Sequence, residues 1–187
     1  LKTIYFVFLL ISSSFLLLQF AVPIAIGNYP IFGEHAIINS IVYNICDWIY
    51  SFGCLVCHQR ADRSWFINGT QMPICVRCLG MTIGILISSV ISFIIVPNGK
   101  FLDNLKGLFF IEKDSNHVKL ALILALFMFP MIIDGFSQIL FDYNSLEITR
   151  LLTGLLFGYF EGSVFFSAVF PLILLGKKVV NKILNIQ

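Results

Sequence analysis

The chain has 187 residues, of which 58% are hydrophobic and only 12% are charged, and its mean hydropathy is +0.93. A soluble globular domain of this length cannot keep so apolar a composition in water, so this class of protein is excluded. The formal net charge is only +2, and no cluster of Lys and Arg is interleaved with aromatic residues, so we expect no nucleic-acid partner.

Four apolar runs are long enough to cross a membrane. The hydrocarbon core is about 30 Å thick, and a helix needs about 20 apolar residues to span it. The runs are Ile4 to Ile26, Leu79 to Val96, Val118 to Leu140 and Leu151 to Leu175. The first is longer than the apolar part of a signal peptide, so we expect a retained helix. The sequence therefore predicts an all-α polytopic membrane protein, with residues 1–187 forming one membrane domain.

Two further segments have an amphipathic pattern. Between His35 and Phe52, apolar residues recur at helical spacing while Asn39, Asn44 and Asp47 gather on another side. This pattern predicts an interfacial or re-entrant helix. The segment from Lys100 to Asp114 has a similar pattern, and we expect it on the opposite membrane surface.

The basic residues predict the orientation, because cytoplasmic loops carry an excess of Lys and Arg. With four spans and an inside N-terminus, all eight Lys residues lie inside and all four Arg residues lie outside. If residues 35–52 also crossed the membrane, five basic residues would lie inside and seven outside, which disfavours that topology. Moving the N-terminus outside as well would restore seven inside against five outside. We therefore expect an integral cell-membrane protein with cytoplasmic termini and an external Cys-rich segment.

The strongest local motif is a pair of C-x2-C sequences, Cys54 with Cys57 and Cys75 with Cys78, separated by 17 residues. Four thiolates at this spacing are typical of a zinc ribbon. The spacer contains Asn68-Gly69, which favours a tight β-hairpin turn between two short strands. Residues 54–78 are thus predicted to form a small Cys-rich metal-binding finger, inserted before the second transmembrane helix, with zinc as the cofactor.

Other interpretations of the cysteines stay open. The metal could have a purely structural role, because so small a finger has little core of its own. An external location also permits disulfides, or a redox-active pair at the start of the second span, where the helix dipole stabilises a thiolate. His58 follows Cys57 directly and could replace Cys54 as the fourth ligand or act as a base beside the metal. We interpret Cys46 as a buried apolar residue.

Several of these residues resemble the signature of an uncharacterised family of small prokaryotic membrane proteins. The matching residues are Cys57-His58-Gln59-Arg60, Arg63-Ser64, Pro73-x-Cys75-x-Arg77-Cys78-x-Gly80, Asp134-Gly135, Gln138, Arg150, Thr153-Gly154 and Gly158. They extend over about half of the chain, and Cys54 lies outside the pattern. The family is a domain of unknown function, so the resemblance implies one shared site and does not name an activity.

Two carboxyl groups lie inside predicted spans, Asp134 and Glu161, and ionisable groups in the hydrocarbon usually face a bundle interior or a cavity. Both are expected at a similar depth below the external surface, near Gln138 and Arg150, so we expect them to share a polar pocket. The alternative is a structural ion pair, with Arg150 neutralising one carboxylate. Small residues at four-residue spacing, including Gly154, Gly158 and Gly162, predict close helix packing.

These observations favour a membrane-embedded hydrolase or transferase that acts on a membrane lipid or another anionic substrate at the external face. Arg60, Arg63, Arg77, Arg150 and Gln138 would bind the anion, and His58, Asp134 and Glu161 would transfer protons. One alternative is a small-ion or solute transporter, which with four spans would have to form a homo-oligomer. Others are a thiol-disulfide redox protein and a structural assembly subunit.

Overall fold

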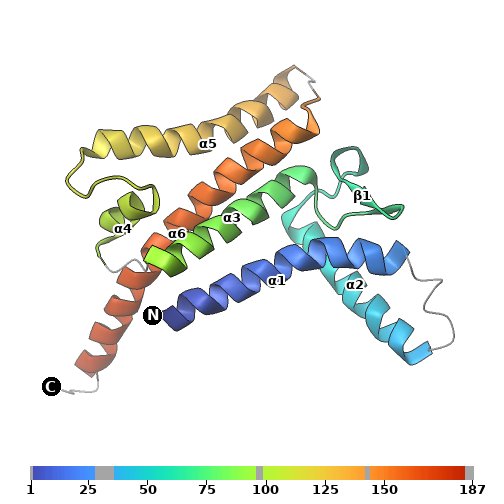
Figure 1. Cartoon of the computed structure of the whole chain (residues 1–187), viewed down its shortest axis with the longest axis horizontal. Helices are drawn as coiled ribbons and strands as arrows, with labels where there is room; N and C mark the ends of the chain where they lie inside the picture. Colours follow the sequence, from blue (N-terminus) through green and yellow to red (C-terminus); the bar gives the residue numbers. More distant parts are fainter. Residues whose placement is uncertain (1, 28–35, 96–98, 142–143, 184–187) are drawn as a thin grey trace.

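The computed structural model describes residues 2–27, 36–95, 99–141 and 144–183. The helices are α1 (Lys2–Gly27), α2 (Ala36–Val56), α3 (Val76–Ile95), α4 (Phe101–Leu108), α5 (His117–Leu140) and α6 (Glu147–Ile183). A short 3-10 helix (Ala61–Arg63) and two strands, β1 (Phe66–Ile67) and β2 (Thr70–Gln71), lie between α2 and α3 (Figure 1). Two residues at predicted boundaries, His35 and Val96, lie outside the described residues.

Four of the described helices are long and apolar enough to cross a membrane: α1, α3, α5 and the part of α6 from Glu147 to Ile173. They coincide with the four predicted spans, so the predicted fold class is confirmed. α6 begins four residues earlier than predicted because Glu147 can occupy the first helical turn, where the helix dipole favours an acidic side chain.

The centre of the bundle is the pair formed by α3 and α6 (Figure 1). Glycines on both helices let the backbones approach closely, as the spacing of small residues predicts. A Cβ atom on Gly80 would lie 3.0 Å from the amide nitrogen of Leu155, and one on Gly84 would lie 2.9 Å from the carbonyl carbon of Gly158. Ser88 continues this contact by bonding Ser163, with 3.1 Å between the two hydroxyl oxygens.

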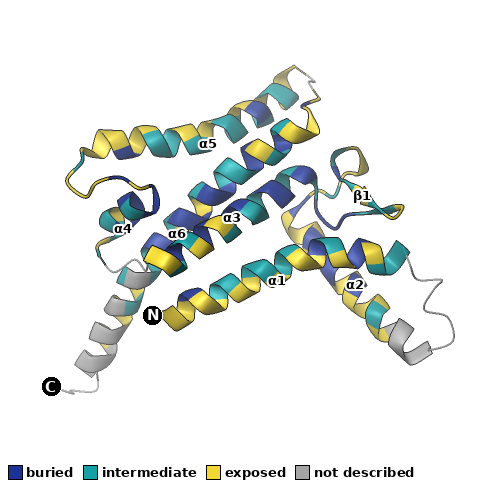
Figure 2. Cartoon of the chain, viewed as in Figure 1, coloured by how far each residue is buried: buried dark blue, intermediate teal, exposed yellow. Residues whose placement is uncertain are grey.

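α1 packs against α3, and α5 packs against α6. The outer faces of these flanking helices are apolar and exposed (Figure 2). On α5, for example, Leu122, Leu126 and Ile133 are each more than 60% exposed and lie on one side of the helix. An exposed apolar stripe of this length is expected where a helix contacts lipid.

α2 and α4 differ from the four candidate spans. α4 has only 8 residues, too few to cross a bilayer. α2 crosses α1 instead of lying alongside it (Figure 1). One face of α2, with Cys46 and Ile49, is buried against Val22 of α1, which confirms the prediction for Cys46. Another face, which includes Trp48, is apolar and exposed, as expected for a helix in the membrane interface.

The predicted hairpin is present as β1 and β2, which pair antiparallel. Asn68 and Gly69 have φ angles of 51° and 77°, the left-handed values that a two-residue hairpin turn requires. The hairpin lies at the same end of the bundle as the connection between α5 and α6, because the Trp65 indole donates to Glu147 at 2.7 Å. The N-terminus and α4 lie at the other end (Figure 1).

Candidate metal centre and anion-binding cavity

Three thiols meet at the hairpin end of the bundle. Cys57 directly follows α2, whereas Cys75 directly precedes α3 and Cys78 lies in its first turn. Their sulfur atoms all lie within 4.8 Å of one another. Cys57, Cys75 and Cys78, which we call the three-thiol group, could therefore hold a metal ion.

Gln59 holds the two halves of this group together, and the sequence analysis assigned it no role. Its backbone has φ of 46°, and its side-chain amide donates to the carbonyl oxygens of Tyr50, at 2.8 Å, and Pro73, at 2.7 Å. These bonds join the end of α2 to the segment before Cys75. The available signal was its position in the Cys-His-Gln run, two residues after Cys57, the first thiol of the group.

The surroundings of the three-thiol group favour negative sulfur. The amide groups of Gln59 and Cys75 donate to the sulfur of Cys57, at 3.4 and 3.2 Å. Hydrogen bonds from the thiols of Cys57 and Cys78 lower the pKa of Cys75 to about 2, while the same contact with Cys75 raises the pKa of Cys57. These contacts favour the thiolate form at Cys75, and the thiolate is the form that binds a metal.

Two of the predicted metal ligands lie outside this group. Among the described residues, neither Cys54 nor His58 belongs to the set of mutually close ligand atoms, although both are exposed and line the adjacent cavity. The predicted zinc-ribbon geometry is wrong for the first C-x2-C pair. α2 continues to Val56, so Cys54 lies on a helix and not in a tight knuckle. Which residue would complete the coordination stays a prediction.

A half-open cavity of about 450 Å³ adjoins the three-thiol group. We call it the arginine cavity, because all four arginines of the chain line it. Its lining comprises the three-thiol group, Cys54, His58, Arg60, Arg63, Arg77, Gln138, Arg150, Leu55, Val56, Met81 and Met131. The structure therefore brings the predicted metal-binding and anion-binding residues into one cavity.

Three of the four arginines form ion pairs with carboxylates. Arg60 donates to Asp62 at 3.1 and 3.2 Å, an exposed pair that lowers the pKa of the Asp62 carboxyl, and Arg63 contacts the same carboxylate at 3.7 Å. Arg77, in the first turn of α3, forms an ion pair with Asp134, which is buried. The alternative of a structural ion pair named Arg150 as the partner of a carboxylate, and the structure has Arg77 in that place.

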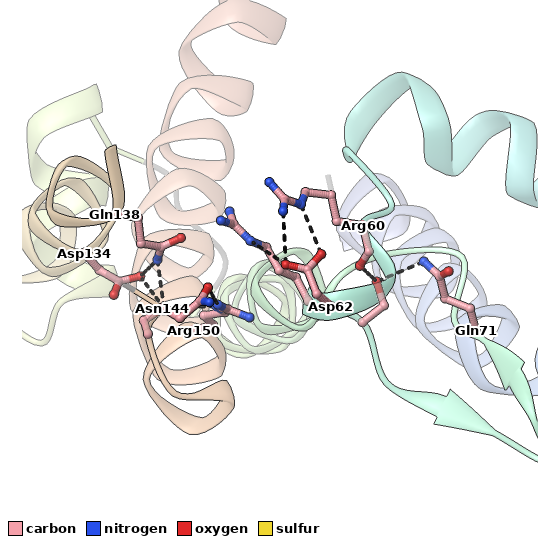
Figure 3. A network of polar contacts seen from close by, with 10 residues as sticks. Arg60, Asp62, Gln71, Asp134, Gln138, Asn144 and Arg150 are labelled. Carbon is pink, nitrogen blue, oxygen red and sulfur yellow. Dashed lines mark hydrogen bonds and ion pairs between the residues drawn. The ribbon is translucent and has the colours of Figure 1, made fainter. Parts of the chain in front are cut away.

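Arg150 has a different environment. It is buried, and it donates to the hydroxyl of Ser145 at 3.0 Å and to the side-chain oxygen of Asn144 at 3.4 Å (Figure 3). The amide of Gln138 donates both to Ser145, at 2.7 Å, and to Asp134, at 3.0 Å. Ser145, which the sequence analysis missed, therefore connects the arginine to the buried ion pair. No sequence motif marks it.

Glu161 lies elsewhere. It is exposed on α6 and lines a second cavity, whereas Asp134 is buried and bonded to residues that line the arginine cavity. The two carboxyls were predicted to share one pocket, whereas the structure places Glu161 in the lining of the second cavity and Asp134 beside residues that line the arginine cavity. Depth along the sequence does not reveal which side of a helix a residue occupies.

Fold and site together define a polytopic α-helical membrane protein with a thiol group and a cluster of arginines at one end of its bundle. The chain belongs to the family described as "Predicted membrane protein (DUF2085)", whose family model matches residues 57–164, more than half of the chain. This confirms the predicted family of prokaryotic membrane proteins. The match begins at Cys57, and it does not test the individual motif residues.

Two archaeal relatives are similar to the chain. An uncharacterized protein of Methanocaldococcus jannaschii is 32% identical over 152 residues, which cover 81% of this chain and 85% of the relative. An uncharacterized protein of Methanothermobacter thermautotrophicus is 28% identical over 100 residues, covering 54% of this chain and 75% of the relative. No solved structure matches the chain.

Proposed function

We propose that the protein is a membrane-embedded metalloenzyme that binds an anionic substrate in the arginine cavity, beside a zinc ion held by the three-thiol group. The observation that carries this proposal is that one cavity is lined both by the three thiols and by all four arginines. A metal site whose only role is to stabilise a finger needs no such cavity.

The charges in the cavity support an anionic substrate. Asp62 pairs with Arg60 and Arg63, and Asp134 pairs with Arg77, but among the described residues Arg150 has no carboxylate partner, although it is buried. A buried guanidinium is costly without a counter-charge, and its planar fork of donors suits phosphate or carboxylate. The Nε group of Arg77 is also buried without a hydrogen-bond acceptor in the described chain. An anion in the cavity would satisfy such donors.

The thiols support zinc among the metals. Soft thiolate ligands favour zinc, and backbone amides that donate to sulfur, as those of Gln59 and Cys75 do for Cys57, favour the thiolate form. Three protein ligands leave one position for water or substrate, as in catalytic zinc sites, and zinc bound there supplies a Lewis acid. His58, exposed in the cavity lining, is the residue best placed to move a proton.

The basic residues support an external location for this site. All four arginines line the cavity at the hairpin end, whereas Lys100, Lys106, Lys113 and Lys119 lie in α4, beside it or at the start of α5, at the other end. By the excess of Lys in cytoplasmic loops, the hairpin end faces outward and the N-terminus lies inside. Labelling with a membrane-impermeant thiol reagent in intact cells tests this: Asn68→Cys should gain label over the unaltered protein, in which exposed Cys54 already reacts, whereas Asp114→Cys should gain none.

The first experiment measures metal content in detergent-purified protein. We expect about one zinc per chain, lost in Cys75→Ser and retained in Cys46→Ser, the control at a cysteine that packs against α1. Metal retained in Cys75→Ser, or absent from the unaltered protein, would contradict the metal site.

The second experiment measures binding of inorganic phosphate to the same protein. Replacing Arg150 by Gln removes charge-assisted hydrogen bonds and should weaken phosphate binding about tenfold or more. Lys100→Gln, at the exposed start of α4, is the control and should bind like the unaltered protein. Equal binding by both variants would refute the role of the arginines.

One observation favours a second candidate, a thiol-disulfide redox protein. The three sulfurs all lie within 4.8 Å of one another, and their hydrogen bonds favour the thiolate form of Cys75, the attacking species in disulfide exchange. Thiol counting before and after reduction separates the candidates. Five free thiols in the native chain, counted after removal of the metal, support the metal site. Only three free thiols would indicate one disulfide.

A further inference from the structure

The second cavity is a groove of about 460 Å³ along the spanning part of the bundle, which we call the apolar groove because, apart from Glu161, Ser12 and Thr82, it is lined by apolar side chains and Cys78. On α3 its lining residues are Cys78, Met81, Thr82 and Ile85, and on α1 they are Phe8, Ile11, Ser12 and Phe15. Each set is spaced as one face of a helix, so the groove follows both helices for about 10 Å. It therefore runs from the hairpin end into the apolar slab.

Aromatic rings close the far end of this apolar groove. Phe8 of α1 packs edge-on against Phe165 and Phe166 of α6, with ring centroids 5.2 and 5.8 Å apart. At the near end the lining includes Phe52 and Val56 of α2. The groove is thus closed toward α4 and leads toward the three-thiol group.

The apolar groove adjoins the arginine cavity. Val56, Cys78 and Met81 line both. One molecule that passes these residues would contact guanidinium groups at one end and aromatic and aliphatic side chains at the other. This combination matches an amphiphile with a negative head and a hydrocarbon tail, and it does not match a small water-soluble anion.

We propose that the apolar groove holds a hydrocarbon chain of a lipid phosphate whose phosphate group lies in the arginine cavity. This inference rests on the proposed function and names its substrate class: the substrate is a lipid with an anionic phosphate head, entering from the bilayer. The charge of the arginines favours the phosphate head group of the lipid. The groove favours a lipid, which has a hydrocarbon chain, over a soluble phosphate.

The test compares two ligands and two matched variants. Phosphatidic acid and inorganic phosphate are titrated onto the full-length protein in a neutral detergent. Ser12→Trp fills the groove; the Ser12 hydroxyl bonds only to its own helix, at Phe8 and Leu9, so no contact between helices is lost. Ser14→Trp, at an exposed position on the same helix, is the control.

We expect Ser12→Trp to weaken phosphatidic acid binding about tenfold without changing phosphate binding, and Ser14→Trp to change neither. Unchanged phosphatidic acid binding in Ser12→Trp overturns the groove and leaves the proposed function standing. If the unaltered protein binds neither ligand, the proposed function itself is wrong.

If Ser12→Trp weakens the binding of both phosphatidic acid and phosphate, a second variant, Thr82→Leu, tests whether the groove holds the lipid chain. Thr82 lines the groove on α3 and its hydroxyl bonds the carbonyl oxygen of Cys78 in the same helix, so this smaller change preserves the helix contacts. Weaker phosphatidic acid binding with unchanged phosphate binding supports the proposal. Unchanged binding of both overturns it.

Discussion

Replacing Gly154 by Ala should separate α3 from α6 and disturb the arginine cavity. A Cβ atom at this position would lie 3.1 Å from the carbonyl carbon of Arg77 and 3.2 Å from the amide nitrogen of Met81, and closer still to the carbonyl oxygen of Arg77. These are backbone atoms in a helix, so they cannot rotate away. The start of α3, which carries Arg77 and Cys78, must move instead.

The expected cost is about 1–3 kcal/mol for overpacking, reduced by about 1 kcal/mol because Ala favours a helix more than Gly does. Gly176→Ala in the same helix is the matched control, because nothing lies within 4 Å of its Cβ position. Both variants gain the same helix propensity, so the difference between them isolates the overpacking at the contact of α3 with α6.

The assay is reversible unfolding in mixed micelles with increasing sodium dodecyl sulfate, followed by phosphate titration of the folded protein. We expect Gly154→Ala to unfold at lower dodecyl sulfate than Gly176→Ala and to bind phosphate more weakly. If the two variants unfold alike, the close approach of α3 and α6 is wrong, and with it the placement of Arg77.

Three further predictions concern single groups. Asp134→Asn leaves a guanidinium without its buried partner and should lower the free energy of unfolding by about 3 kcal/mol, whereas Asp62→Asn, at an exposed pair, should leave it unchanged; dodecyl sulfate unfolding measures both. Alkylation of the metal-loaded protein should modify exposed Cys54 and should modify the three-thiol group only after a chelator is added. Peptide mass spectrometry identifies the modified cysteines. If Cys54 is protected equally, it is a fourth metal ligand. Glu161→Gln should leave the affinity for phosphate unchanged, whereas Arg150→Gln should weaken it. If only Glu161→Gln changed the affinity, the anion would bind in the second cavity and not in the arginine cavity.

Much of the fold follows from the sequence because the bilayer imposes a simple rule. A span must be long, apolar and helical, and four runs of the chain meet that condition. The hairpin was equally predictable, because Asn68-Gly69 can adopt the left-handed backbone that its turn needs. The packing of α3 on α6 follows from glycines at four-residue spacing, which line up on one helix face.

The site was predicted in composition but not in pairing. The arginines could be recognised as one set because the predicted topology puts all four on one side, yet residue type does not show which of them meets Asp134. That depends on how the helices are placed relative to one another, and the structure selects Arg77. Likewise, the C-x2-C spacing suggested a knuckle at Cys54, but the helical propensity of α2 continues through it.

The three-thiol group takes its sulfurs from two helices with different relations to the membrane. Cys57 follows a helix that lies across the bundle, whereas Cys78 belongs to the second span. An ion bound by this group would restrain the end of α2 against the start of α3, and its removal would release α2 without unfolding the spans.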